Sequence, residues 1–309
     1  MLSCFVVQLT PPVRGVIAAD NLSLRSVPIT HYRYLADHST MKPASVSLWE
    51  VAHTSPFSYG KAHQFIESIL VPTFVFSIFY VIAIFALKAF MANRKPLELK
   101  PILIGWNGFL AVFSILGSYY MSKALLVDIS NDGLVGSYCK FGDILPGEYG
   151  LWALIFGLSK LIEVGDTILL VLRKKPLIFL HWYHHMVTMN FAMIAYTHKN
   201  GINGWMCWMN YTVHALMYSY YFVASCGIRI PTVISRCVTT SQILQFTLTM
   251  VQMIHIASLQ LSGTQCEFHA PTLVLGLAME FSYLVLFGHF FYKAYVHNGG
   301  QKFKKQKQS

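Results

Sequence analysis

Charged side chains are scarce in this sequence of 309 residues. Asp, Glu, Lys and Arg make up 12% of it, whereas 55% of the residues are hydrophobic. Because soluble globular domains carry about 25% charged residues, this composition excludes a water-soluble protein. The net charge is +10, but nucleic-acid binding explains it poorly, since the positive residues lie in short segments between apolar runs. The composition therefore indicates an integral membrane protein.

Cysteine pairs of the kind that hold zinc are missing as well. The six cysteines include no C-x-x-C pair and no spacing typical of zinc ligands. Cys139 and Cys266 fall in two loops that we predict to face an oxidising compartment, where disulfides persist. We therefore predict a disulfide between them. The other four are terminal or lie within or beside apolar runs: Cys4, Cys207, Cys226 and Cys237.

Seven apolar runs are long enough to cross a bilayer, which takes about 20 residues. We expect a helix in each, because a helix satisfies its backbone N–H and C=O groups internally and an open sheet in lipid does not. The predicted fold is an all-α membrane protein, with a lead of residues 1–63, a seven-helix domain of residues 64–297 and a basic tail of residues 298–309. The predicted spans are residues 64–90, 102–127, 147–172, 176–198, 204–226, 232–258 and 270–297.

Lys and Arg gather after the first, third and fifth spans and in the tail, whereas the intervening loops are poorer in positive charge. Positively charged loops stay in the cytosol, so we predict a luminal N-terminus and a cytosolic C-terminus. Asn21 begins a glycosylation sequon on the luminal side. In the tail, Lys305 and Lys307 have the spacing of a retrieval signal for the endoplasmic reticulum, although a plain basic anchor explains them equally well.

Ionisable residues occur inside the third predicted span, in the stretch "KLIEVGDT". Each such group costs about 2.5–3.5 kcal/mol at mid-bilayer on insertion scales, so we expect these groups to face inward and to pair. Helical periodicity places Lys160, Glu163 and Thr167 on one face, with Asp166 beside them.

The next three spans each carry a polar stripe at a similar depth. In "HWYHH", His181, His184 and His185 share a helix face by the i, i+3, i+4 rule. These stripes predict a pocket in the cytosolic half of the membrane, the alternative being that every polar group is a structural hydrogen bonder between helices. The fifth span adds Asn210, His214, Met217, Tyr218 and Tyr221, and the sixth adds Gln242 and Gln245.

Three histidines within five residues first suggest a metal site. The di-iron enzymes of membranes need more histidine ligands than His214 and this cluster supply, so we predict no metal, with a single ion held by a histidine and a carboxylate as the alternative. Without a metal, an imidazole acts as base or nucleophile near neutral pH. A carboxylate such as Asp166 would hold its tautomer, and Lys160 or Asn210 would stabilise an oxyanion. Acyl transfer fits these groups.

Four motifs resemble, in order and spacing, those of the ELO family of very-long-chain fatty acid elongases. The family motifs read K-x-x-E-x-x-D-T, H-x-x-H-H, N-x-x-x-H-x-x-M-Y-x-Y-Y and T-x-x-Q-x-x-Q. This chain has "KLIEVGDT", "HWYHH", "NYTVHALMYSYY" and "TTSQILQ". The resemblance runs from residue 64 to about residue 297. It implies seven helices, six of them ringed around a closed-ended tunnel for an acyl chain.

The resemblance also implies the condensing enzyme of fatty acid elongation in the endoplasmic reticulum membrane. An acyl-CoA and malonyl-CoA would give a 3-oxoacyl-CoA two carbons longer, with CO2 and CoA released and no bound cofactor. His184 is the candidate nucleophile or base, and His214 would assist decarboxylation or protonate the leaving thiolate. His181 and His185 would orient these groups, with Asp166 and Glu163 fixing tautomers. The candidate substrate-binding residues are Lys160, Thr167, Asn210, Met217, Tyr218, Tyr221, Gln242 and Gln245.

The stretch "PLIFLHWYHH" looks similar to the branch of the family that extends saturated and monounsaturated chains, so we expect saturated, monounsaturated or methyl-branched substrates. Expected partners are the reductases and dehydratase of the elongation cycle, and a homo- or hetero-oligomer is left open. Two other classes stay as alternatives. A di-iron lipid oxygenase or desaturase would contain iron and need O2, and a receptor or transporter would tolerate exchange of Lys160, His184 and His214.

Overall fold

A computed structural model describes residues 46–142, 147 and 149–297, all of them within one compact unit. These residues form helices and no strand. The sequon at Asn21 and the lysines at 305 and 307 lie outside the described residues. The elements are α1 (Leu48–Ala52), α2 (Tyr59–Met91), α3 (Lys100–Cys139), α4 (Gly150–Ile162), α5 (Gly165–Leu172), α6 (Phe179–Tyr196), α7 (Asn203–Ser225), α8 (Thr232–Leu261), α9 (Ala270–Phe291) and a π-helical turn, Tyr292–Val296.

Four helices are long and apolar enough to cross a membrane, judged by length and composition: α2, α3, α8, and α9 with its π-helical turn. The third predicted span falls short because the helix is interrupted at Glu163 and Val164, which separates α4 from α5. The helices α6 and α7 carry the histidine, asparagine and tyrosine side chains of the polar stripes, and these lower their hydropathy. The structure is thus an all-helical membrane protein with four spans identified on these criteria.

Several predicted boundaries are wrong. The expected loop of residues 128–146 is helical as far as Cys139, because α3 continues through a bend at Gly133, whose φ of +72° suits glycine. The residues "SNDG" before this bend are typical of turns, which explains the error. The expected polar lead contains α1, which begins with a capping box between Ser47 and Glu50.

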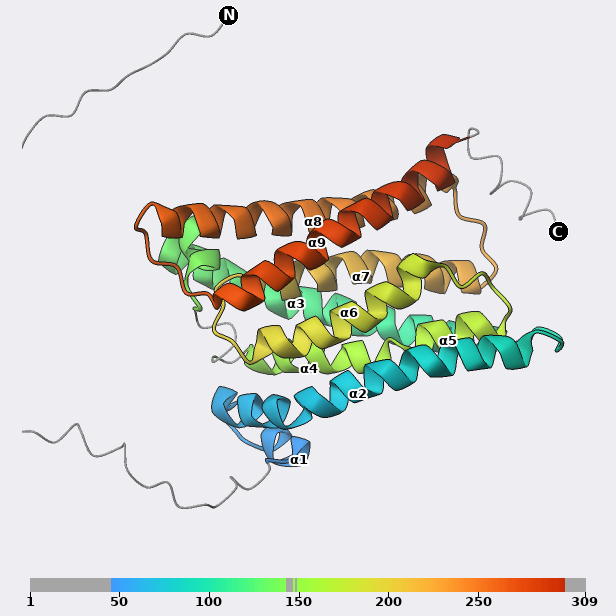
Figure 1. Cartoon of the computed structure of the whole chain (residues 1–309), viewed down its shortest axis with the longest axis horizontal. Helices are drawn as coiled ribbons and strands as arrows, with labels where there is room; N and C mark the ends of the chain where they lie inside the picture. The colour runs from blue at the N-terminus through green and yellow to red at the C-terminus, as the bar shows by residue number, and fades with distance from the viewer. Residues whose placement is uncertain (1–45, 143–146, 148, 298–309) are drawn as a thin grey trace, which may run out of the picture. The chain divides into compact units, whose positions relative to one another are not determined.

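Contacts between neighbouring helices form a closed circuit. Going round it, α3 contacts α4, α4 contacts α6, α6 contacts α9, α9 contacts α8, α8 contacts α7, and α7 returns to α3. The helix α2 lies outside this circuit and packs on α5 and α6. Figure 1 shows α2 along one edge of the bundle and α8 and α9 along the opposite edge. Six helical segments therefore turn a face towards a shared interior.

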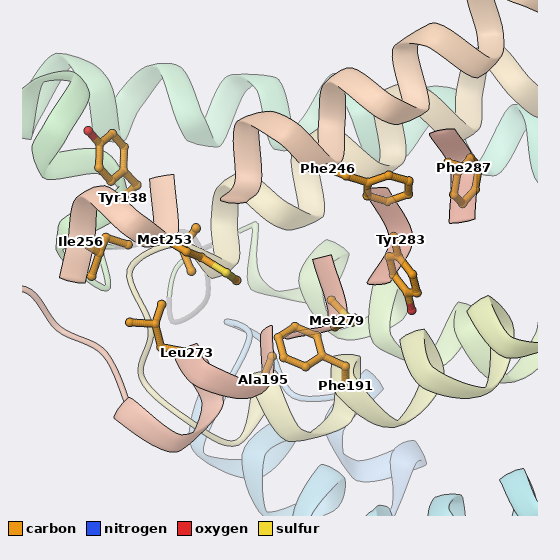
Figure 2. Close-up of a cluster of buried hydrophobic side chains, with 11 residues drawn as sticks. Tyr138, Phe191, Ala195, Phe246, Met253, Ile256, Leu273, Met279, Tyr283 and Phe287 are labelled. Atoms are coloured by element: carbon orange, nitrogen blue, oxygen red, sulfur yellow. The ribbon is translucent and has the colours of Figure 1, made fainter. Parts of the chain in front are cut away.

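A cluster of apolar side chains fixes α9 against α6 and α8. Phe246 of α8 packs on Tyr283 and Phe287 of α9, with ring centroids 5.3 and 4.9 Å apart. Figure 2 shows these rings together with Phe191 of α6 and Met279 of α9. The packing places the Tyr283 ring beside α6, where it contacts His184 of the predicted histidine cluster.

At the other end of α6, the predicted pair Cys139 and Cys266 forms a disulfide, with Cα atoms 4.6 Å apart. Backbone hydrogen bonds continue this connection: Glu267 N–H donates to Cys139 O at 2.7 Å, and Gly201 N–H donates to Glu267 O at 2.9 Å. Three loops that lie far apart in the sequence are joined in this way. We call them the disulfide end, which comprises residues 138–142, 197–203 and 262–269.

Candidate active site

The first feature of the site is a buried ion pair between Lys160 of α4 and Glu163, the residue that directly follows this helix. Lys160 Nζ donates to Glu163 Oε1 at 2.7 Å and to Asn210 Oδ1 of α7 at 3.0 Å. All three side chains are buried. His214 Nδ1 lies 3.8 Å from the same Glu163 oxygen. The predicted pairing of charges inside the third span is therefore present, and it extends to the fifth predicted span.

Asp166 has different partners from those predicted. Its Oδ1 accepts from the indole Nε1–H of Trp106 at 2.5 Å, and its Oδ2 accepts from the hydroxyl of Tyr218 at 2.7 Å. Both carboxylate oxygens are thereby occupied, and neither bonds to a histidine. The role of tautomer holder that we predicted for Asp166 does not match these contacts. The carboxylate instead joins α3, α5 and α7.

The histidines of α6 form a row that begins at α5. His181 Nε2 lies 3.0 Å from Thr167 Oγ1, which also exchanges a hydrogen bond of 2.8 Å with Tyr80 of α2. The ring centroids of His181 and His185 are 4.7 Å apart, and those of His185 and His184 are 5.6 Å apart. Thr167 is fully buried, so its hydroxyl anchors one end of this row.

His184 lies at the inner end of the row and differs from His181 in its contacts. Its ring packs against Tyr283 and Phe287, with centroids 4.9 and 6.1 Å away. Among the described residues, none is hydrogen-bonded to its imidazole. The ring nitrogens of a histidine in this setting are available to a substrate.

Two cavities meet at His184. The larger, of about 860 Å³, begins among Arg173, Lys175 and Arg236 and reaches the histidines. The smaller, of about 70 Å³, continues along α6 as far as Tyr196. Four residues line both cavities: His184, Asn210, Gln245 and Phe246. A ligand that occupies both cavities would therefore pass the His184 ring.

The remaining predicted residues lie along the larger cavity. Gln242 Nε2 donates to the sulfur of Met217 at 3.3 Å, which connects α8 to α7. Gln245 lines both cavities, and Tyr221 lines the larger one with 44% of its surface exposed. With these, every side chain of the four motifs that we singled out, apart from Glu163, lies in the cavity linings or is hydrogen-bonded to a residue that does. Glu163 bonds to Lys160 and lies 3.8 Å from the ring of His214, which lines the larger cavity.

Sequence reasoning missed four residues of this region. Trp106, Tyr80 and Ser159 supply hydrogen bonds to Asp166, Thr167 and Glu163 respectively. Single polar groups of this kind give no pattern in an apolar run. The fourth, Glu280 of α9, lines the smaller cavity and is buried. An ionisable residue within an apolar run is the signal that identifies it.

The arrangement suits acyl transfer. An unpaired imidazole is a nucleophile or base, and the amide of Asn210, which lines both cavities and is held by Lys160, supplies donors. No group of three or more His, Cys, Asp or Glu side chains within the described part of the chain is placed to hold a metal ion. That no metal or cofactor is used stays a prediction.

Comparison with known proteins decides between these chemistries at the level of family. Residues 65–303 match the model of the ELO family, described as the GNS1/SUR4 family. The chain belongs to the ELO family. It is similar to long chain fatty acid elongase 1 of Caenorhabditis elegans, with 43% identity over 73% of this chain and 78% of the relative. It is also similar to the human very long chain fatty acid elongase 6, with 35% identity over 83% of this chain and 96% of the relative.

A third relative, very long chain fatty acid elongase 6 of Drosophila melanogaster, is 39% identical over 73% of this chain and 72% of its own. The family match includes all of α3 to α9, and therefore the whole of both cavity linings. The ELO-family assignment and the four polar stripes thus concern the same part of the molecule.

Proposed function

We propose that this protein catalyses the condensation step of fatty acid elongation. A long-chain acyl-CoA and malonyl-CoA combine to a 3-oxoacyl-CoA two carbons longer, and CO2 and free CoA leave. The observation that supports this most is the position of His184, an imidazole without a hydrogen-bond partner among the described residues, where two cavities meet. A stretch of the acyl chain in the smaller cavity and CoA in the larger one would place the thioester beside this ring.

In the first step, a ring nitrogen of His184 attacks the thioester carbonyl. A carbon–nitrogen bond forms, the carbon–sulfur bond breaks, and CoA leaves as a thiolate that takes up a proton. The developing oxyanion needs hydrogen-bond donors, and the amide of the Asn210 side chain, which lines both cavities, is the candidate. In the alternative, His184 acts as a base and no covalent intermediate forms.

In the second step, malonyl-CoA enters the larger cavity and loses CO2. The carbon that carried the carboxylate attacks the acyl carbonyl, the carbon–nitrogen bond breaks, and the leaving imidazole takes up one proton from solvent, which returns His184 to its starting state. This proton replaces the one that the acylated ring gave to the CoA thiolate. We assign assistance in this step to His214, whose Nδ1 faces Glu163 at 3.8 Å. The Glu163 carboxylate attracts a proton on His214, whereas the Lys160 ammonium paired with that carboxylate opposes it, so His214 is suited to hold a proton only briefly.

We place the protein in the endoplasmic reticulum membrane with seven spans and a cytosolic C-terminus. The disulfide supports an even number of crossings between Cys139 and Cys266, because both cysteines must lie on one side. Counting α4 with α5 as one span, then α6, α7 and α8, gives four crossings. Arg173, Lys175 and Arg236 would then surround the cytosolic mouth, where the phosphates of CoA enter.

The proposed reaction uses malonyl-CoA as co-substrate and needs no bound cofactor. We propose saturated, monounsaturated or methyl-branched acyl chains as substrates, with a tunnel through the helical circuit receiving the chain. The product requires reduction, dehydration and a second reduction to become a saturated chain, so reductases and a dehydratase are the expected functional partners.

The first prediction tests the role of His184. With labelled malonyl-CoA and a panel of acyl-CoAs, His184→Ala should lower turnover at least about a thousandfold, the size of loss seen when a nucleophile is removed. The matched control is His289→Ala, which removes an exposed histidine near the C-terminal end of α9. This variant should keep full turnover. Turnover that survives in His184→Ala would contradict the assigned site.

The covalent step has its own measurement. Purified enzyme that is mixed with acyl-CoA alone should release about one CoA per active site if an acyl-imidazole forms. His184→Ala should release none. Elongation that proceeds without such a burst would leave His184 the role of a base.

A further inference from the structure

The smaller cavity contains two buried polar groups that have no partner. Glu280 of α9 is 2% exposed, and its Oε2 has no hydrogen-bond partner in the described part of the chain. Tyr196, at the end of α6, is 5% exposed, and its hydroxyl likewise has no hydrogen-bond partner among the described residues. Both residues line the cavity, whose other walls are mostly apolar.

This contrasts with the polar groups of the larger cavity. There, both oxygens of Asp166 accept hydrogen bonds, and His181 is hydrogen-bonded to Thr167. A buried polar atom without a partner destabilises the fold, so such atoms are rare and call for an explanation by water or ligand. Two of them on one cavity with a mostly apolar lining point to a group that binds there.

The two groups lie along the route that an acyl chain would take. Glu280 precedes Tyr283 by three residues, about 4.5 Å of helix rise, and the Tyr283 ring contacts His184. Tyr196 follows His184 by twelve residues of α6, about 18 Å of rise. A chain that extends from His184 towards Tyr196 would therefore meet Glu280 first and Tyr196 near its end.

We propose that the smaller cavity is a subsite for acyl chains that carry a hydroxyl group, which Glu280 and Tyr196 recognise by hydrogen bonds. This inference deepens the proposed function and rests on it. The hydroxyl donates to the Glu280 carboxyl group, or accepts from the Tyr196 hydroxyl, according to its position along the chain.

The chemistry of the two groups favours a hydroxyl over other substituents. A second carboxylate on the chain would be repelled by Glu280 if both were ionised, and it offers no donor in that form. An ammonium group donates but accepts nothing, so the Tyr196 O–H would stay unpaired. A hydroxyl is small, neutral, and both donor and acceptor. The cavity, at about 70 Å³, has room for such a group beside a short stretch of chain.

The test compares acyl-CoAs of one chain length, either unsubstituted or with a single hydroxyl at successive positions. The readout is kcat/KM for malonyl incorporation by the full-length enzyme, expressed as the ratio of hydroxylated to unsubstituted substrate. For at least one position, Glu280→Met should lower this ratio at least about tenfold, because the apolar side chain has similar length and accepts no hydrogen bond. The control Glu67→Met removes an exposed carboxylate on α2 and should leave the ratio unchanged.

The outcomes separate this inference from the proposed function. If the wild type elongates neither substrate, the proposed function fails. If it elongates unsubstituted chains but the ratio in Glu280→Met equals that of the wild type at every position, the subsite is overturned and the two polar groups hold water only. If Glu280→Met is inactive with both substrates, the ratio is measured with Tyr196→Phe. An unchanged ratio in that variant overturns the subsite too.

Discussion

Hydrogen bonds between side chains hold the region around the histidines, whereas a disulfide and hydrogen bonds of backbone amides hold the disulfide end. Some of these amides bond to backbone oxygens and some to the side chains of Glu267 and Asn200. In the histidine region, Lys160 with Asn210 joins α4 to α7, and Thr167 with His181 joins α5 to α6. At the disulfide end, loops are joined by Cys139 with Cys266 and by the amides of Gly201 and Glu267.

This difference suggests a division of tasks. Buried polar side chains cost free energy of desolvation and need good geometry, so they are a weak means of gaining stability but a strong means of fixing positions. A disulfide restricts the unfolded chain and places no demand on neighbouring side chains. Changes in the histidine region should therefore lower both stability and turnover, and changes at the disulfide end should lower stability alone.

The largest effect should follow from breaking the buried ion pair. Glu163→Gln leaves the charge of Lys160 uncompensated inside the bundle and should destabilise the protein by about 3–5 kcal/mol. Turnover of the remaining folded protein should fall as well, because His214 loses the carboxylate that faces it. Thermal unfolding in detergent and malonyl incorporation measure the two effects.

The control for this variant is Glu267→Gln at the disulfide end. Glu267 is exposed, and its Oε2 accepts from the amide of Phe141 at 2.7 Å. An amide oxygen still accepts that bond, so the change should cost at most about 1 kcal/mol. If Glu163→Gln and Glu267→Gln lowered the stability by the same small amount, the ion pair would not stabilise the histidine region.

The disulfide itself should have the next largest effect. The double change Cys139→Ser and Cys266→Ser should destabilise the protein by about 2–4 kcal/mol. At temperatures well below unfolding, elongation per folded molecule should equal that of the wild type. Peptide masses with and without reduction check that the bond is present. A loss of turnover in the folded double variant would contradict the division between the two regions.

A smaller effect is expected from Gly201→Ala. A Cβ at this position would lie 2.6 Å from Lys140 O and 2.7 Å from Tyr138 O, both backbone atoms that do not move without shifting the loop. The variant should be less stable by about 1–3 kcal/mol. Gly60→Ala serves as control, because a Cβ there meets nothing within 4 Å. Equal unfolding temperatures for the two variants would show that the close packing of the three loops is unimportant.

Much of the histidine region could be predicted from the sequence, because ionisable residues in apolar runs must face the interior of the bundle and pair there. We expected Lys160 and Glu163 to pair, and they do. The third and fourth predicted spans run in opposite directions, which puts Thr167 at the depth of His181, and the two are hydrogen-bonded. The same reasoning applies to Glu280, a single carboxyl group in the last span. It has no neighbour in the sequence to form a pattern, and only the structure shows the cavity that it lines.

Other features could not be read from the sequence for physical reasons. Trp106 and Tyr80 are ordinary members of apolar runs until the fold brings them to Asp166 and Thr167. The interruption at Glu163 and Val164 lies directly before Gly165, and a single glycine in a helical pattern does not by itself predict a break. At the end of α3, residues typical of turns precede the bend at Gly133, yet the helix continues beyond the bend to Cys139.

The disulfide also has a consequence for biosynthesis. Its two cysteines are 127 residues apart, and α4 to α8 lie between them. The bond therefore forms only after all of these helices have been synthesised and have returned the chain to the side where α3 ended. In a population of newly made molecules, a free thiol at Cys139 would mark those whose helices are not yet assembled. Pulse-labelling with a thiol reagent would thus follow the assembly of the bundle in time.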